Sequence, residues 1–265
     1  MNIDGIEVLI EGSKQPDAQI IVMIHGWPDT LQLWDAQVAA LRNRYRCVRF
    51  TLPGFDKQLP IRAHSLGEVV SFIRAVVQKV SPERPVILLV HDWGCLFGYE
   101  FYMRHPDHVS RIVGVDIGDA SSPAFLRSLP FKAKVMIACY QLWLALAWVI
   151  GGRVGNGMTR TMASVLRCPS DAGAISAQMN YPYFIQWTGR YGSYRKLAPF
   201  DPRCPMLYLY GRNKPFMFHS QAWVDSFVNR TGSKAIGMNT GHWVMTEDPS
   251  QFNNVVLSWL GNNPV

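Results

Sequence analysis

The chain has 265 residues, of which 48% are hydrophobic and 17% are charged. This length and apolar content suffice for one compact α/β domain with an insertion, and they exclude a largely disordered protein. The formal net charge is +7, but Lys and Arg are spread along the chain without a dense run, so no nucleic-acid partner is expected.

The cysteines form an odd-numbered set without a CxxC spacing, namely Cys47, Cys95, Cys139, Cys168 and Cys204. Such a set indicates neither a disulfide framework nor a zinc site. We therefore expect a reducing, cytoplasmic location, with no metal and no cofactor. The N-terminus lacks a basic start followed by a long apolar stretch, so no secretory signal is expected.

Short β-rich runs alternate with helical stretches, which predicts βαβ units and a mostly parallel sheet with helices on both faces. The run at 85–90 is continuously apolar, as in a strand buried on both faces. Strands are expected at 20–26, 46–54, 85–90, 111–116, 206–210 and 234–238. Helices are expected around 31–43 and at 65–80, 219–230 and 249–260.

The strand pattern stops between residues 120 and 199, where aromatic and helical sequence is interrupted by glycines and prolines. This indicates a helical cap at 120–199, inserted into a core formed by 1–119 and 200–265. Within the cap, 135–152 is almost wholly apolar and approaches the ~20 residues that span a bilayer. A spanning helix there would separate two halves of one sheet. We expect a buried cap helix lining an apolar pocket, with peripheral membrane contact as the alternative.

The segment Val90-His91-Asp92-Trp93-Gly94 lies where a buried strand gives way to a helix. The small residue two positions after Asp92 permits the tight turn of a nucleophile elbow, with Asp where many hydrolases have Ser. An aspartate there is near a helix N-terminus, whose dipole favours the ionised carboxylate. By itself, the residue is equally explained as a helix N-cap.

A second motif, HGWP at 25–28, directly follows the first strongly apolar strand. Its glycine allows a sharp turn of the backbone. Trp27 and Trp93 can then offer two N–H groups to an oxygen that gains charge near Asp92. The candidate oxyanion- and substrate-binding residues are His25, Trp27, Pro28 and Trp93.

A third motif, Thr240-Gly241-His242-Trp243, follows the last predicted strand, from where His242 can reach the elbow. The order nucleophile, acid, histidine is that of α/β-hydrolases. Together, the segments HGWPDT, HDWG and GHW resemble the epoxide hydrolase and haloalkane dehalogenase branch of the α/β-hydrolase superfamily, over nearly the whole chain. The resemblance implies the α/β-hydrolase fold. It also implies that Asp92 attacks carbon to form an ester, which water activated by His242 then hydrolyses.

The two families of this branch differ in the leaving group that the site must stabilise. An epoxide oxygen needs a proton donor as the ring opens, whereas a departing halide needs N–H groups around the anion. The cap segments 139–143 and 192–195 resemble those from which epoxide hydrolases project ring-opening tyrosines, which would be Tyr140 and Tyr194. Trp27 stands where similar dehalogenases usually have Asn. The resemblance favours hydrolysis of a small lipophilic epoxide by water, with haloalkane dehalogenation as the alternative. The alternative is that Tyr140 and Tyr194 only pack in an aromatic cap, which is the role expected of Tyr181, Tyr183 and Tyr191.

The third residue of the catalytic triad, the acid that orients the histidine, departs from the family pattern. Many relatives place it just after the strand that ends here at Tyr210, where this sequence reads GRNKP. Some members place it after the preceding strand, and Asp116 falls at that position, so we assign it to orient His242. Asp119 is the second choice, and Asn213 alone holding the ring is a third. Because the carboxylate is missing at the usual position, a non-catalytic, ligand-binding protein with the hydrolase fold stays an alternative. The sequence does not decide the oligomeric state, and a homodimer is one alternative.

Overall fold

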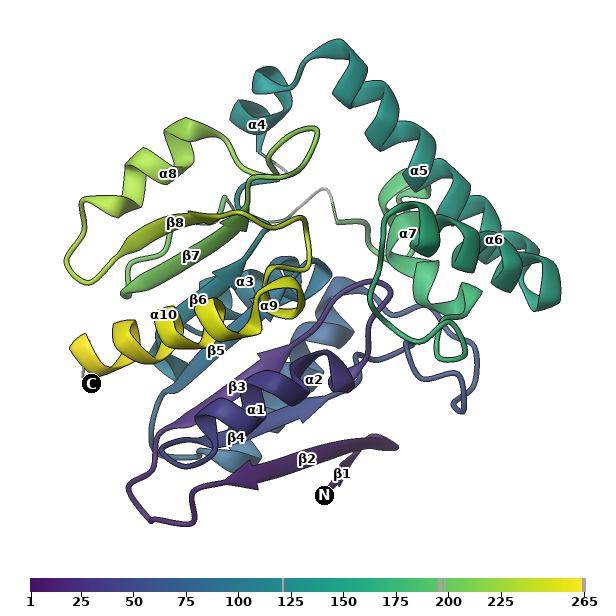
Figure 1. Cartoon of the computed structure of the whole chain (residues 1–265). Helices are drawn as coiled ribbons and strands as arrows, with labels where there is room; N and C mark the ends of the chain where they lie inside the picture. The colour runs from purple at the N-terminus through teal and green to yellow at the C-terminus, as the bar shows by residue number, and fades with distance from the viewer. Residues whose placement is uncertain (121, 195–196, 198, 264–265) are drawn as a thin grey trace.

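The computed structural model describes the whole chain except residues 121, 195–196, 198 and 264–265. Within this described part, eight strands form one sheet in the order β1-β2-β4-β3-β5-β6-β7-β8 (Figure 1). Strand β2 runs antiparallel to β1 and β4, and the other neighbours are parallel. The strands are β1 (Asn2–Ile3), β2 (Ile6–Gly12), β3 (Ile20–Ile24), β4 (Arg46–Phe50), β5 (Val86–His91), β6 (Val109–Val115), β7 (Met206–Gly211) and β8 (Lys234–Met238).

Both faces of the sheet are covered, as expected from the apolar, buried residues of β3 and of β5 up to Val90. Successive side chains of a strand point to opposite faces, so Val22 and Leu88 lie in one apolar layer while Ile21 and Leu89 lie in the other. The first layer is completed by α2 (Leu66–Val80), α3 (Trp93–Arg104) and α8 (Gln221–Val228). The second is completed by α1 (Asp35–Leu41) and α10 (Pro249–Asn262). The predicted mostly parallel sheet with helices on both faces is confirmed.

The six predicted strands correspond to β3 through β8. The predicted helix around 31–43 is shorter, because it begins with the 3-10 turn η1 (Leu31–Trp34) before α1. The sequence interpretation missed β1, β2 and the short helix α9 (Val244–Glu247). In β2, buried Ile6 and Val8 alternate with exposed Glu7, the period-2 pattern of a strand with one covered face.

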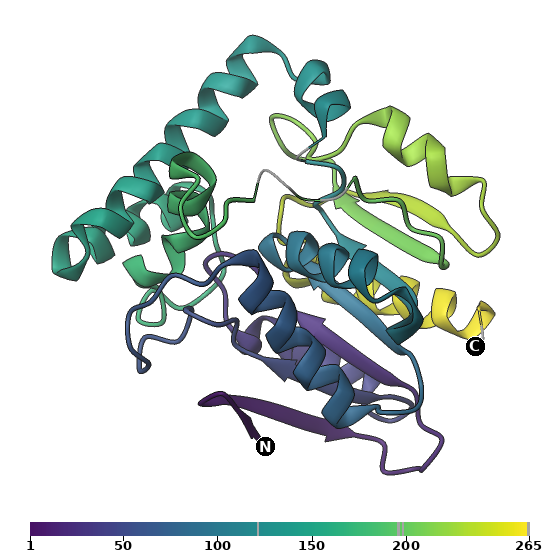
Figure 2. The same ribbon diagram turned by 180° about the vertical axis from the view of Figure 1, so that it is seen from behind.

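The segment between β6 and β7 is helical, and it lies beyond the carboxyl ends of the central strands in both views (Figures 1 and 2). Helix α5 packs against α6 and α7. The division into a core at 1–119 and 200–265 and a cap at 120–199 stays a prediction, and part of that cap lies outside the described residues. The segment contains α4 (Pro123–Ser128), α5 (Phe131–Ile150), α6 (Gly152–Val165), the 3-10 turn η3 (Ala177–Asn180) and α7 (Tyr181–Thr188).

Helix α5 corresponds to the apolar segment expected at 135–152. Among the helices that the structure describes, it alone is long and apolar enough to cross a membrane by those two criteria. The expectation of a buried helix is wrong for its outer face, because only 22% of its most apolar window is buried. Leu144 and Ala147 face the protein, whereas Leu146 and Val149 are exposed.

Tyr99 ties helix α3 to the loop that follows β6. Its hydroxyl donates to the carbonyl of Ile117 at 2.8 Å, and its ring stacks on Phe200 with centroids 3.8 Å apart. Gly114 leaves room for this side chain, because a Cβ atom at Gly114 would collide with the Tyr99 hydroxyl. The helix after Asp92 and the loop after Asp116 are thereby held together.

We expect Tyr99→Phe to lower the free energy of unfolding by about 1–2 kcal/mol, because the Ile117 carbonyl would lose a buried donor. Urea denaturation measures the change. Tyr191→Phe is the matched control, since Tyr191 is exposed. Equal losses in both variants would show that the Tyr99 bond does not stabilise the fold.

Candidate active site

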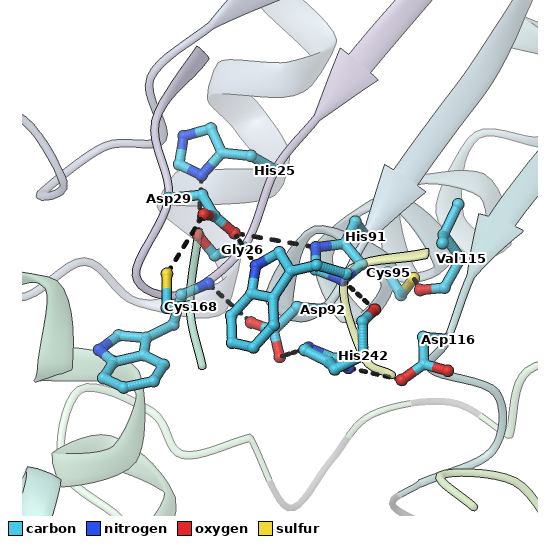
Figure 3. A network of polar contacts seen from close by, with 12 residues as sticks. His25, Gly26, Asp29, His91, Asp92, Cys95, Val115, Asp116, Cys168 and His242 are labelled. Carbon is cyan, nitrogen blue, oxygen red and sulfur yellow. Dashed lines mark hydrogen bonds and ion pairs between the residues drawn. The ribbon is translucent and has the colours of Figure 1, made fainter. Parts of the chain in front are cut away.

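The residues of the three sequence motifs meet at one edge of the sheet (Figure 3). Asp92 follows β5, Asp116 follows β6, and His242 lies in the loop after β8. Trp27 lies in the loop after β3. They converge because the carboxyl ends of parallel strands lie on the same side of a sheet.

The backbone at Asp92 is strained. Its φ of +51° and ψ of −124° form a combination that L-residues rarely adopt. The turn needs glycine at two positions that lie close to it in space. A Cβ atom at Gly26 would collide with the Asp92 carboxylate, and one at Gly94 would collide with the carbonyl of Ile24. This turn directs the carboxylate away from the sheet, and 15% of the side chain remains exposed.

The two oxygens of Asp92 have different partners. Oδ1 accepts a hydrogen bond from the backbone N–H of Trp27 at 2.7 Å, and Oδ2 lies 3.4 Å from Nε2 of His242. Burial alone would raise the pKa of Asp92, but the hydrogen bond and charge of His242, with the Trp27 N–H, hold that pKa below its usual value. The carboxylate is therefore ionised and able to act as a nucleophile.

His242 is held between two carboxylates. Its Nδ1 donates to Oδ2 of Asp116 at 2.5 Å, which leaves Nε2 facing Asp92. Burial alone would lower the pKa of His242, but the hydrogen bonds and charges of Asp116 and Asp92 raise it to about 9. In the resting protein the ring is thus an imidazolium at neutral pH.

Asp116 is fully buried and has a positive φ of +67°, a conformation that Asp tolerates better than most residues. Its Oδ1 accepts hydrogen bonds from the backbone N–H of Gly211 at 2.9 Å and from Nζ of Lys214. Burial favours the neutral acid, but the charges of Lys214 and His242 outweigh it, so the pKa of Asp116 lies below its usual value. The side chain can therefore fix and charge-stabilise the histidine ring.

The other two candidates for the acid lie elsewhere. The carboxylate of Asp119 accepts from the N–H and the hydroxyl of Ser220, both at 2.7 Å. Asn213 is exposed, and no side-chain hydrogen bond from it to His242 occurs among the described residues. Sequence reasoning missed Lys214. The available signal was a lysine in the loop after β7, where relatives place the acid, but its contact with Asp116 depends on the tertiary structure.

His25 and Pro28 shape the turn beside the site. Nε2 of His25 accepts from the backbone N–H of Leu52 at 2.9 Å, and Nδ1 donates to the carbonyl of Gly26 at 2.9 Å. Burial lowers the pKa of His25 to about 4, so its ring is neutral. Pro28 follows Trp27 through a cis peptide bond.

Two tyrosines of the helical segment lie near Asp92. The rings of Tyr140 on α5 and Tyr183 on α7 meet edge to face, with centroids 6.1 Å apart. Burial, and then the negative charge of Asp92, raises the pKa of both hydroxyls. Tyr183 also meets the rings of Trp27 and Trp93, with centroid distances of 5.8 and 5.3 Å. Sequence reasoning had treated Tyr183 as a packing residue.

Tyr194 is buried and also contacts the ring of Trp93. The centroids of these two rings are 5.5 Å apart. The Tyr194 hydroxyl donates to the carbonyl of His64 at 3.4 Å, and the charge of Asp92 is not among the causes that raise its pKa. The structure thus brings Tyr140 and Tyr183 together near the elbow, and directs the Tyr194 hydroxyl toward His64.

A buried polar network supports the loop that carries His242. The His91 ring lies 4.5 Å from the His242 ring between centroids, and its Nε2–H donates to the His242 carbonyl at 3.1 Å. Burial lowers the pKa of His91 to about 3, so it is neutral. Trp243 donates from its indole to Oδ2 of Asp29 at 3.0 Å. Sequence reasoning identified neither contact.

Asp29 also binds the helical segment. Its Oδ1 accepts from the hydroxyl of Ser170 and from the Cys168 thiol at 3.8 Å. Burial raises the pKa of Asp29 to about 6, although Ser170 and Trp243 both favour the ionised form. No group of three or more His, Cys, Asp or Glu side chains in the described part of the chain is arranged to hold a metal ion.

Comparison with known proteins gives three kinds of likeness. The sequence model of the α/β-hydrolase fold family matches residues 19–145. A protein from Mycobacterium tuberculosis named probable oxidoreductase EphD is 34% identical over 112 residues, which are 41% of this chain and 19% of that protein. The match therefore spans about a fifth of that relative's length. Epoxide hydrolase 3 from Xenopus tropicalis is 20% identical over 98% of this chain and 76% of that protein.

A solved structure is similar over almost its full length. It is a mutant epoxide hydrolase from Bacillus megaterium in complex with its diol product, with a TM-score of 0.74 and 17% sequence identity. The match covers 98% of this chain and 99% of that one. At this identity the likeness shows a shared fold.

The contacts of His242 predict its titration. We expect NMR titration of the ring to give a pKa of about 9, and Asp116→Asn to lower it, because the hydrogen bond to an ionised carboxylate and its negative charge would be lost. Asp119→Asn is the control and should leave the value unchanged. Because the pKa of His242 in the folded state lies above its ordinary value of 6.5, this interaction stabilises the fold fully below pH 6.5 and loses that effect as the pH rises through 9. An unchanged His242 pKa in Asp116→Asn would contradict the assigned contact.

Proposed function

We propose that this chain, which has the α/β-hydrolase fold, is an enzyme that hydrolyses epoxides to vicinal diols through an ester formed on Asp92. One observation carries the proposal: an ionised aspartate at a strained elbow faces a histidine whose other ring nitrogen binds a buried carboxylate. The likeness to proteins named epoxide hydrolases supports the substrate class.

In the first step, Oδ2 of Asp92 attacks a ring carbon of the epoxide, and the bond between that carbon and the ring oxygen breaks. The oxygen keeps the electron pair and takes a proton from the Tyr140 hydroxyl. Burial keeps this hydroxyl protonated by raising its pKa, so the proton is available only when a stronger base forms beside it. The departing alkoxide is such a base.

A second hydroxyl would share the developing charge on the ring oxygen. The family resemblance assigns this role to Tyr194. The contacts offer Tyr183 as the alternative, because its ring lies against those of Tyr140 and Trp27. The two assignments predict different mutant effects.

In the second step, the ester is hydrolysed. Once Asp92 is esterified its charge is gone, which removes part of what raises the pKa of His242. The ring can then return its proton to the tyrosinate. Neutral Nε2 takes a proton from water as the water oxygen attacks the ester carbonyl carbon.

Negative charge then develops on the carbonyl oxygen, Oδ1 of Asp92, which accepts the Trp27 N–H. The N–H of Trp93, the first residue of α3, is our proposed second donor, because the first N–H groups of a helix have no intrahelical partner. The tetrahedral intermediate collapses, and the diol oxygen leaves with the proton held by His242. The new Asp92 carboxyl group then passes the remaining water proton to His242, which restores the ionised carboxylate and the imidazolium.

Halide release would use the same nucleophile and base, but it needs N–H groups aimed at a departing anion. The indole N–H of Trp27 instead donates to Oδ1 of Asn180 at 2.7 Å. This contact favours epoxide opening over dehalogenation. The bond from His242 to Asp116 favours a catalytic protein over a ligand-binding fold that has lost its triad.

We expect Asp92→Ala to abolish diol formation and His242→Gln to accumulate the ester, because only the second step needs the histidine as a base. Intact-protein mass spectrometry should then show His242→Gln heavier by one substrate molecule. His108→Gln, in a surface 3-10 turn, is the control and should turn over normally. Diol formation near the wild-type rate in Asp92→Ala, or substrate consumption without an adduct in His242→Gln, would refute the ester mechanism.

We expect Tyr140→Phe to slow ester formation by ~10²- to 10⁴-fold, the usual contribution of a general acid. On the contacts described, Tyr183→Phe should cause a larger loss than Tyr194→Phe. Tyr181→Phe is a matched control from α7, because the buried Tyr181 hydroxyl has no hydrogen-bond partner in the described chain. Single-turnover kinetics on a styrene oxide substrate measure each rate. If Tyr140→Phe reacts as fast as Tyr181→Phe, proton donation by the helical segment is wrong and dehalogenation gains.

A further inference from the structure

The charge of the chain is distributed unevenly. Residues 120–199 contain nine Lys and Arg residues and one acidic residue, Asp171, whereas the rest of the chain has 17 basic and 18 acidic residues. The net positive charge of the protein therefore comes entirely from this segment. Between Asp119 and Asp171 the sequence has no acidic residue at all.

The same segment exposes a long apolar surface, which we call the α5 outer face. It consists of side chains at spacings of three and four residues, so they share one side of the helix. Phe131 is 82% exposed, Val149 64% and Leu146 50%. At 1.5 Å per residue the face is about 28 Å long. Its members are Phe131, Val135, Leu142, Trp143, Leu146, Val149 and Ile150.

Basic side chains border this face at both ends. Lys132 and Lys134 lie in the first turn of α5, and Arg153 lies at the start of α6. All three side chains are exposed, and none of them forms an ion pair with a described residue. Three further arginines of the segment are exposed, namely Arg127 on α4, Arg160 on α6 and Arg167 just after α6.

We propose that the α5 outer face docks on the surface of an anionic lipid bilayer. The helix would lie along the interface, with its apolar side chains among the acyl chains and the flanking Lys and Arg near the anionic headgroups. Exposed Trp143 supplies the aromatic side chain that is typical of such interfaces. Continuous exposed apolar surface of this size marks an interaction site, and the basic border selects an anionic partner.

A surface position fits the structure better than a membrane span. The inner face of α5 is buried through Ala133, Leu144 and Ala147, and the helix packs against α6 and α7. A span would break these contacts. It would also separate Tyr140 from Tyr183, since the two lie on different helices.

A second copy of the chain is a poorer occupant of this face. Two docked copies would bring together two segments that each carry nine basic residues and one acidic residue. Like-charge contact opposes association, whereas an anionic bilayer attracts the same residues.

The docking has a consequence for substrate, which rests on the proposed function. Tyr140 belongs to α5 and lies near Asp92, so one side of this helix faces lipid while the other faces the site. Epoxides dissolved in the bilayer, such as those of long acyl chains, would therefore reach the site without crossing bulk water.

Co-sedimentation of the whole chain with lipid vesicles tests the docking without any activity measurement. We expect binding to vesicles of phosphatidylglycerol mixed with phosphatidylcholine, and much weaker binding to phosphatidylcholine alone or at high salt. Leu146→Ser combined with Val149→Ser should weaken binding about tenfold. Lys132→Glu combined with Lys134→Glu should weaken it by at least about tenfold.

Two control variants carry changes of the same kind outside the helical segment. Lys79→Glu combined with Lys234→Glu changes the net charge equally, at the end of α2 and the start of β8. Ile10→Ser removes an exposed apolar side chain from β2. Both should bind vesicles like the wild type.

Three outcomes would overturn the docking: equal binding to neutral and anionic vesicles, equal weakening in the α5 variants and the controls, or no binding at low salt. Sedimentation velocity showing a dimer that Leu146→Ser with Val149→Ser dissociates would assign the face to a second copy instead. Turnover of a water-soluble epoxide should be unchanged in all these variants. Failure of the docking is thereby distinguishable from failure of the proposed reaction.

Discussion

The site depends on how a fully buried carboxylate, Asp116, is kept charged. Removing such a group from water is unfavourable unless hydrogen bonds and opposite charges replace the lost hydration. Lys214, a backbone N–H and His242 supply that replacement on both oxygens. With Asp92 on the other side of the ring, two carboxylates and two cations form a compact cluster in which each charge has an opposite neighbour.

Because of this balance, the pKa values of Asp92, Asp116 and His242 depend on one another. The pKa of His242 is raised to about 9 by the same two carboxylates whose own pKa values it helps to lower. Neutralising either Asp92 or Asp116 must therefore lower the pKa of His242. Esterification of Asp92 would be such a neutralisation, so the first step of the proposed reaction prepares the base for the second.

The sequence predicted the parts of the site that local pattern encodes. The elbow at Asp92, the HGWP turn and His242 each follow a recognisable strand, so their meeting at one edge of the sheet follows from parallel topology. Asp116 could be found by counting strands. Tyr183, Lys214 and the contact of Trp243 with Asp29 could not, because their roles arise from helices and loops packing across the fold. For the same reason the exposure of α5 was missed, since composition alone does not tell a buried apolar helix from an exposed one.

Asp29 holds two parts of the protein with one side chain. One oxygen binds Ser170 of the helical segment and the other binds Trp243, the neighbour of His242. A movement of that segment away from the sheet would break the hydrogen bond from Ser170. The buried Asp29 carboxylate would then have fewer hydrogen-bond donors, and its contact with the indole of Trp243 would weaken. The position of the loop that carries His242 therefore depends on the position of the helical segment, because both are fixed to the same carboxylate.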